Sequence, residues 1–166
     1  MELTKIERRL LANQYHILSL LDEGNAERYE NLRDALENGY EAAYHYEVFG
    51  SMLDPLSPWQ CKLVIDIMSM YSSIQRSFEA LDDKTGIDEW RTWFPGFDGD
   101  QETTYEGYAR YVAEKEHRFT DLKPNTEDFE SHTPTVKRYR RMIPVWESIE
   151  NRNELTREDT ISILDA

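Results

Sequence analysis

Hydrophobic residues along most of the chain recur three, four and seven positions apart, the spacing of one face of an α-helix. The first such segment begins after Thr4, whose spacing to Glu7 is that of a capping box, and it ends before Gly24. Its apolar positions are Ile6, Leu10, Leu11, Ile17, Leu18 and Leu21. The pattern predicts a first amphipathic helix.

A second helix is predicted over residues 26–49, and Gly50 and Pro55 end it. Its inner face is Tyr29, Leu32, Leu36, Tyr40, Ala43 and Tyr44. Gly39 falls in the middle of this stretch, where glycine costs about 1 kcal/mol relative to alanine. We interpret it as a point where another helix approaches closely.

A third helix is predicted over residues 57–81, because Ser57 followed by Pro58 is typical of a helix start. Its opening half, VIDIMSMY, is apolar on nearly all sides. A helix of this kind lies at the centre of a fold or at a subunit interface. We expect it to be the hub of the structure.

Residues 82–100 contain four large aromatic side chains among glycines and a proline. They are Trp90, Trp93, Phe94 and Phe97. A polar loop does not carry so many aromatics, so an ordered loop that packs on the helices is predicted, with a helical turn near residues 88–93.

The rest of the chain predicts further helices separated by a polar, irregular stretch over residues 120–132. A fourth helix is expected over residues 101–119, and a fifth begins with Thr133-Pro134 and is kinked at Pro144. A short last helix follows Thr156, where Asp159 completes an acidic capping box.

No segment alternates with the period of two that a strand requires. The fold class is therefore all-α: a multi-helical bundle of five to six helices, in a single domain over residues 1–166. A long, ordered, aromatic-rich loop lies between helices three and four.

The chain carries 33 acidic and 19 basic residues, a formal net charge of −14. This excess disfavours nucleic acid and anionic membranes and suits a basic protein partner. No apolar stretch is long enough to span a bilayer or to serve as a secretion signal. The single cysteine, Cys61, excludes an intrachain disulfide. We expect a cytoplasmic protein with no membrane anchor.

Five runs in order along the chain resemble the YfbU family of bacterial proteins. They are ERRLLANQYHIL, LENGYE, VIDIMSMY, GFDGDQETTYEGYARYV and HTPTVKRYRRMIPVWE. The family is all-helical and has no assigned biochemical activity, so the resemblance implies a helical fold, a bacterial cytoplasmic origin and a homo-oligomer. It implies no catalytic residues.

Two weak metal-ligand patterns occur in predicted helices. Glu114 and His117 have the Glu-x-x-His spacing of di-iron carboxylate bundles, and Glu41 and His45 lie four residues apart. With 33 acidic residues, such spacings also arise by chance on a solvated face. We expect no bound metal and no cofactor.

The enzyme alternative is a helical ribonuclease. Arg110 and His117 are similar to the Arg…His signature of HEPN-type helical ribonucleases, in which the Arg would stabilise phosphate and the His would transfer a proton. An exposed Arg and a His seven positions apart share a helix face whether or not they do chemistry.

Two groups of residues could instead bind a protein. One is the basic cluster Lys137, Arg138, Arg140 and Arg141, which could equally be the solvated side of its helix. The other is the loop aromatics Trp90, Trp93 and Phe94. The leading hypothesis is a non-enzymatic, oligomeric protein-interaction module.

Overall fold

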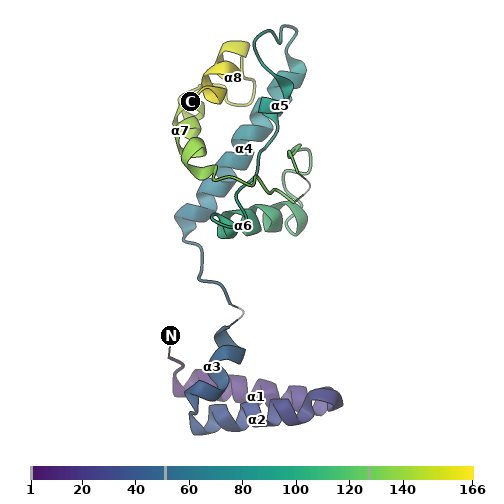
Figure 1. Ribbon diagram of the computed structural model, residues 1–166, viewed down its shortest axis with the longest axis vertical. Coiled ribbons are helices and arrows are strands. Elements are labelled where there is room, and N and C mark those ends of the chain that lie inside the picture. Colours follow the sequence, from purple (N-terminus) through teal and green to yellow (C-terminus); the bar gives the residue numbers. More distant parts are fainter. Residues whose placement is uncertain (1, 51, 127) are drawn as a thin grey trace. The chain divides into compact units, whose positions relative to one another are not determined.

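The computed structural model describes residues 2–50, 52–126 and 128–166, and in these ranges all regular elements are helices (Figure 1). The all-α class is confirmed, but eight α-helices replace the five to six predicted. They are α1 (Lys5–Leu21), α2 (Ala26–Asn38), α3 (Glu41–Phe49), α4 (Pro58–Ala80), α5 (Glu89–Thr92), α6 (Thr103–Glu114), α7 (Val136–Glu147) and α8 (Arg157–Leu164), with a 3₁₀-helix, η1 (Glu23–Asn25), after α1.

The contacts divide the chain into two compact units, residues 1–55 and 56–166. Each has its own cluster of buried hydrophobic side chains. That residues 1–166 form one domain stays a prediction, and each unit is described by itself.

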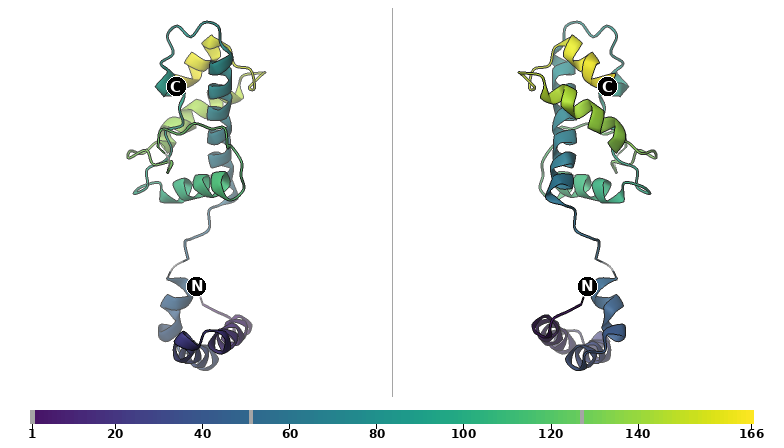
Figure 2. Two further views of the ribbon diagram at one scale, coloured as in Figure 1. Left: turned by 90° about the vertical axis from the view of Figure 1, so that its right-hand side faces the viewer. Right: turned by 90° about the vertical axis from the view of Figure 1, so that its left-hand side faces the viewer.

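The N-terminal unit is built on α1 and α2, which lie side by side in both views of Figure 2. The predicted capping box is present: the Glu7 amide donates to the Thr4 hydroxyl, and the Glu7 carboxylate accepts from the Thr4 amide. The buried hydrophobic core of this unit is small. It consists of Ala12, Leu32, Ala35, Leu36 and Tyr44.

The single helix predicted over residues 26–49 is wrong, because Gly39 ends α2 instead of lying inside a helix. Gly39 has φ +76°, a left-handed conformation that glycine adopts without steric cost. The Tyr40 amide then donates to the Ala35 carbonyl, the bond of a Schellman cap. A close approach does occur here: a Cβ on Gly39 would lie 2.6 Å from Nη1 of Arg8 in α1.

The C-terminal unit is organised around α4, which packs against α5, α6, α7 and α8. The predicted start is confirmed, with Pro58 in the first turn and a capping box between Ser57 and Gln60. Eleven of the 23 residues of α4 are buried, including five aliphatic or methionine side chains with no exposed surface. These are Val64, Ile67, Met68, Met70 and Ile74. The hub predicted from the apolar run is therefore confirmed.

The predicted aromatic loop packs through two of its four aromatic residues. Phe94 and Phe97 are fully buried, whereas Trp90 and Trp93 are 62% and 37% exposed. The Phe94 and Phe97 amides donate to carbonyls of Lys123 and Phe129, so this loop runs beside the irregular segment 120–132. The expected helical turn is α5.

Two predicted helix boundaries are wrong. The fourth helix ends at Glu114 and not near residue 119, since His117 and Phe119 adopt left-handed φ values of 53° and 56°. The fifth helix begins at Val136 with Thr135 as its N-cap residue, so Pro134 lies outside it. Pro144 lies inside α7 as expected.

The start of α7 is held by a carboxylate from another part of the chain. Glu102, at the start of α6, is only 8% exposed and accepts from the Thr135 amide (3.0 Å), the Val136 amide (2.9 Å) and the Thr135 hydroxyl (3.1 Å). The amides of a helix N-terminus lack partners within the helix, so an anion there is stabilising. Glu102 thus joins α6 to α7.

Replacing Glu102 by Ala is expected to lower the free energy of unfolding by about 2–4 kcal/mol, because buried donors lose their acceptor. The Glu102→Gln variant retains one acceptor oxygen and should lose less. Urea unfolding followed by circular dichroism measures both. Glu114→Ala, at the exposed end of α6, is the control and should change stability by less than about 0.5 kcal/mol. Equal losses in E102A and E114A would contradict the role of Glu102.

Burial raises the pKa of the Tyr71 hydroxyl to about 12 from its ordinary value of 10.0. The folded state therefore holds this proton more tightly than the unfolded state, and the associated stability is complete below pH 10 and lost as the pH rises from 10 to 12. Urea unfolding at a series of pH values should show this fall, and Tyr71→Phe should make it shallower. The exposed Tyr111→Phe is the control, and an equal effect of both variants would refute the assignment.

Candidate interaction surface

Helix α1 has two apolar faces, and only one of them packs within the N-terminal unit. Ala12 and Ser19 are buried, and Leu11 and Tyr15 are half-buried against the small core. The Tyr15 ring also stacks on that of Tyr29 in α2, with 6.1 Å between centroids. This face fixes the orientation of α1.

The second face of α1 is hydrophobic and exposed. Its aliphatic side chains are between 54% and 77% exposed: Ile6, Leu10, Ile17, Leu20 and Leu21. The sequence pattern had placed Ile6, Leu10, Ile17 and Leu21 on one helix face with Leu11 and Leu18. The structure separates them, because the small side chains Ala12 and Ser19 let α2 approach on the other side. We call this exposed face the α1 seam.

The seam has the spacing of a coiled coil. Ile6, Leu10, position 13, Ile17 and Leu20 follow one another at intervals of four, three, four and three residues. This alternation places residues at the a and d positions that face a partner helix. Asn13, which is exposed, occupies the middle d position. From Ile6 to Leu20 the seam is about 21 Å long at 1.5 Å per residue.

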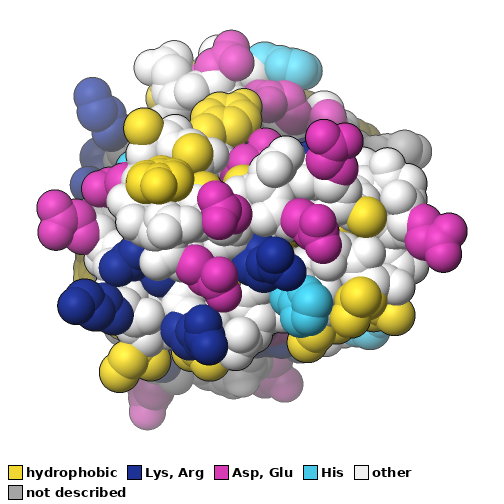
Figure 3. Space-filling model, turned by 90° about the horizontal axis from the view of Figure 1, so that it is seen from below, with side chains coloured by type: hydrophobic (Ala, Val, Ile, Leu, Met, Phe, Trp, Pro, Cys, Tyr) yellow, Lys and Arg dark blue, Asp and Glu magenta, His cyan; other side chains and the backbone are white. Residues whose placement is uncertain are grey.

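Figure 3 shows one face of the molecule, on which hydrophobic side chains lie in separate patches among acidic and basic side chains. None of the helices in the described ranges is long and apolar enough to cross a bilayer.

The predicted loop site is not one surface. Phe94 lies in the core, in contact with the rings of Tyr71 and Phe97 at centroid distances of 5.5 and 5.8 Å. Trp90 and Trp93 remain exposed, to 62% and 37%. Only the two tryptophans are therefore accessible to a partner.

The predicted basic cluster lies on α7 and is partly engaged. The Arg140 guanidinium lies over the Trp59 ring, 4.9 Å from its centroid, and Arg141 donates to the Ala166 carbonyl (2.7 Å). Lys137 is exposed and Arg138 is half-buried. The cluster thus helps to hold α4 and the C-terminal end against α7.

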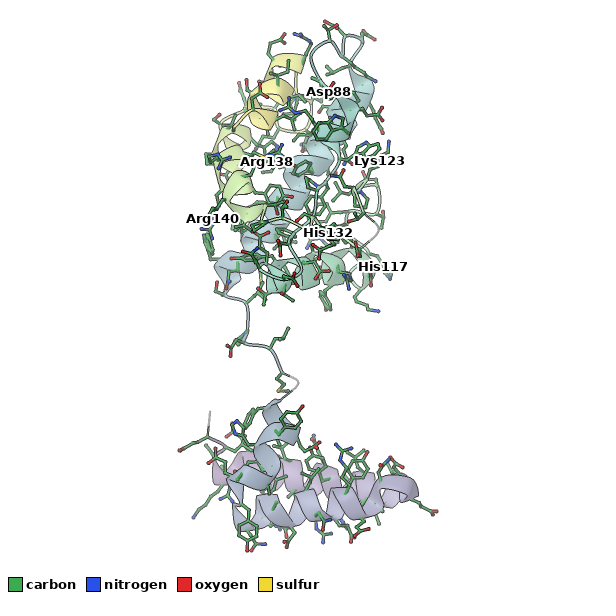
Figure 4. All side chains as sticks on the ribbon, in the orientation of Figure 1. Asp88, His117, Lys123, His132, Arg138 and Arg140 are labelled. Atoms are coloured by element: carbon green, nitrogen blue, oxygen red, sulfur yellow. The ribbon has the colours of Figure 1, made fainter. Side chains whose placement is uncertain are left out.

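The ribonuclease candidates do not share a helix face. Arg110, on α6, pairs with Glu106 and donates to the Asp128 carbonyl (3.1 Å). His117 lies beyond the end of α6 in a left-handed conformation. Figure 4 shows His117 and Arg140 on opposite sides of the C-terminal unit, so the basic cluster does not complete this site.

The metal-ligand candidates also stay apart. Glu114 is the last residue of α6, so the Glu-x-x-His spacing does not lie on a helix. In α3, Nδ1 of His45 lies 3.8 Å from a Glu41 carboxylate oxygen, and both side chains are about half exposed. Within the part of the chain that the structure describes, no three His, Cys, Asp or Glu side chains are grouped to hold a metal ion.

A family model of the YfbU domain matches residues 1–166. The chain belongs to the YfbU family. The membership expected from the five sequence runs is thereby confirmed. Because the match covers both units, the α1 seam is part of the YfbU domain and is not an appended segment.

Proposed function

We propose that this YfbU protein is a non-enzymatic interaction module that assembles as a homo-oligomer, with the α1 seam of one copy packed against the α1 seam of a second. The observation that carries the proposal is the exposed a/d pattern from Ile6 to Leu20 on a helix already held by α2. Because α1 is formed before association, pairing does not require a helix to fold.

The size of the seam favours a stable partner. Five aliphatic side chains that are each more than half exposed present on the order of 500 Å² of apolar surface, as large as the largest patches on monomeric proteins. One partner of a standard interface contributes about 800 Å². The seam and its polar margin together approach that area.

A second copy is the occupant that best suits the composition of the seam. Asn13 would lie in an otherwise aliphatic contact, where its buried amide requires a hydrogen-bonding partner. An identical helix supplies that partner, since the amide of an asparagine both donates and accepts. An entirely aliphatic partner helix would leave Asn13 unsatisfied.

The small core of the N-terminal unit supports the same conclusion. Five buried hydrophobic residues in a unit of 55 residues provide little apolar burial, and units of this size commonly gain stability by association. The net charge of −14 keeps the assembly soluble and favours a basic protein in the cytoplasm as a further partner.

Ile17→Lys is expected to convert the oligomer to monomer at micromolar concentration, because two like charges would meet in an apolar contact. Light scattering coupled to gel filtration measures the mass, and circular dichroism checks that the helices are retained. Asn31→Lys adds the same charge at an exposed position of α2 and should leave the mass unchanged. A monomeric wild type would refute the oligomer, whereas an I17K oligomer would refute the α1 seam as its interface.

Asn13→Leu completes the aliphatic seam and is expected to tighten association at least tenfold while giving a mixture of oligomeric states. Analytical ultracentrifugation over a range of concentrations measures both effects. Asn31→Leu, at an exposed position of α2, is the control. An unchanged dissociation constant in N13L would place Asn13 outside the contact.

A further inference from the structure

The C-terminal unit contains a groove whose polar side chains are hydrogen-bond donors. It has a volume of about 340 Å³ and is separate from the α1 seam. It is lined by Ser69, Ser72, Ser73 and Arg76 of α4, by Phe119, and by Trp146, Arg152 and Asn153. We propose that this groove binds a small organic phosphate monoester.

The α4 side of the groove is a polar stripe. Ser69, Ser72, Ser73 and Arg76 follow at the three- and four-residue intervals of one helix face. The three hydroxyls and the guanidinium therefore point to the same side of α4. Hydroxyl and guanidinium groups are the donors that phosphate oxygens accept from.

The groove is lined by two arginines, and Arg76 donates to the side-chain oxygen of Asn153 (3.5 Å). No carboxylate lines it, although the chain carries 33 acidic residues. Neither Arg76 nor Arg152 forms an ion pair with a carboxylate among the residues that the structure describes. The two acidic residues of α4, Asp66 and Glu79, pair with Lys62 and Lys123.

The Trp146 ring forms an apolar part of the groove lining and is only 7% exposed. The Arg152 guanidinium lies over the same ring, 5.1 Å from its centroid, which orients this charge at the groove.

The shape of the groove favours a phosphate ester over inorganic phosphate. Two arginines from different segments suit a tetrahedral dianion with several acceptor oxygens. Phe119 and Trp146 supply apolar walls, which the carbon skeleton of an ester would contact. A volume of about 340 Å³ falls within the range of small-molecule sites.

Isothermal titration calorimetry of the full-length protein with glycerol phosphate, inorganic phosphate and acetate, at equal ionic strength, tests the proposal. We expect glycerol phosphate to bind most tightly. The Arg76→Gln and Arg152→Gln variants should each weaken its binding at least tenfold, while Lys137→Gln, which removes an exposed positive charge outside the groove, should not change it.

Three outcomes overturn the proposal: no binding of glycerol phosphate at millimolar concentration, equal weakening by Lys137→Gln, or tighter binding of acetate. None of these outcomes bears on the mass of the oligomer, so the proposed function is tested separately.

Discussion

The burial of α4 on several sides is the constraint on which the C-terminal unit depends. Four other helices contact α4, whereas in the described part of this unit the only further pair in extensive contact is α7 with α8. Met68 and Met70 point to nearly opposite sides of the helix axis, about 160° apart at 3.6 residues per turn, and both are fully buried. Because α5 to α8 cover these side chains, the apolar surface of α4 sets the position of each of these four helices. A polar substitution in this run would therefore affect the whole unit.

Buried polar groups give this apolar arrangement its specificity. Glu102 accepts from the first amides of α7, and the Gln75 side chain both donates to the Lys123 carbonyl and accepts from the Lys123 amide at 2.8 Å. A buried donor or acceptor without a partner costs more than a hydrogen bond contributes. Only the arrangement that satisfies Glu102 and Gln75 together is therefore stable. This requirement fixes the position of Lys123, which lies outside the regular elements.

The two candidate binding surfaces, the α1 seam and the groove beside α4, differ in chemistry. On α1 the seam is aliphatic, with Asn13 as its one polar position, and it suits another helix. On α4 the stripe that ends at Arg76 is polar and faces Trp146, and it suits a small anion. On another side, each helix packs against neighbouring helices of its own unit. The exposed residues are thus those that packing does not require, which is why both surfaces are candidates for function.

The sequence by itself determined the helical class, the starts of α1, α4 and α8, and the central position of α4, since capping boxes and periodicity are local properties. It also led to the YfbU family through its five runs. Tertiary structure decided what local patterns cannot contain: Gly39 ends a helix where a Schellman cap forms, and α7 begins where Glu102 reaches its amides. Tertiary structure also decided the burial of the loop aromatics: Phe94 and Trp90 are both aromatic residues of one loop, but Phe94 is fully buried and Trp90 is 62% exposed. Likewise, Ile17 of α1 is exposed because α2 packs against the small residues on the other face of α1. Periodicity alone does not tell which of two apolar faces a neighbouring helix will cover.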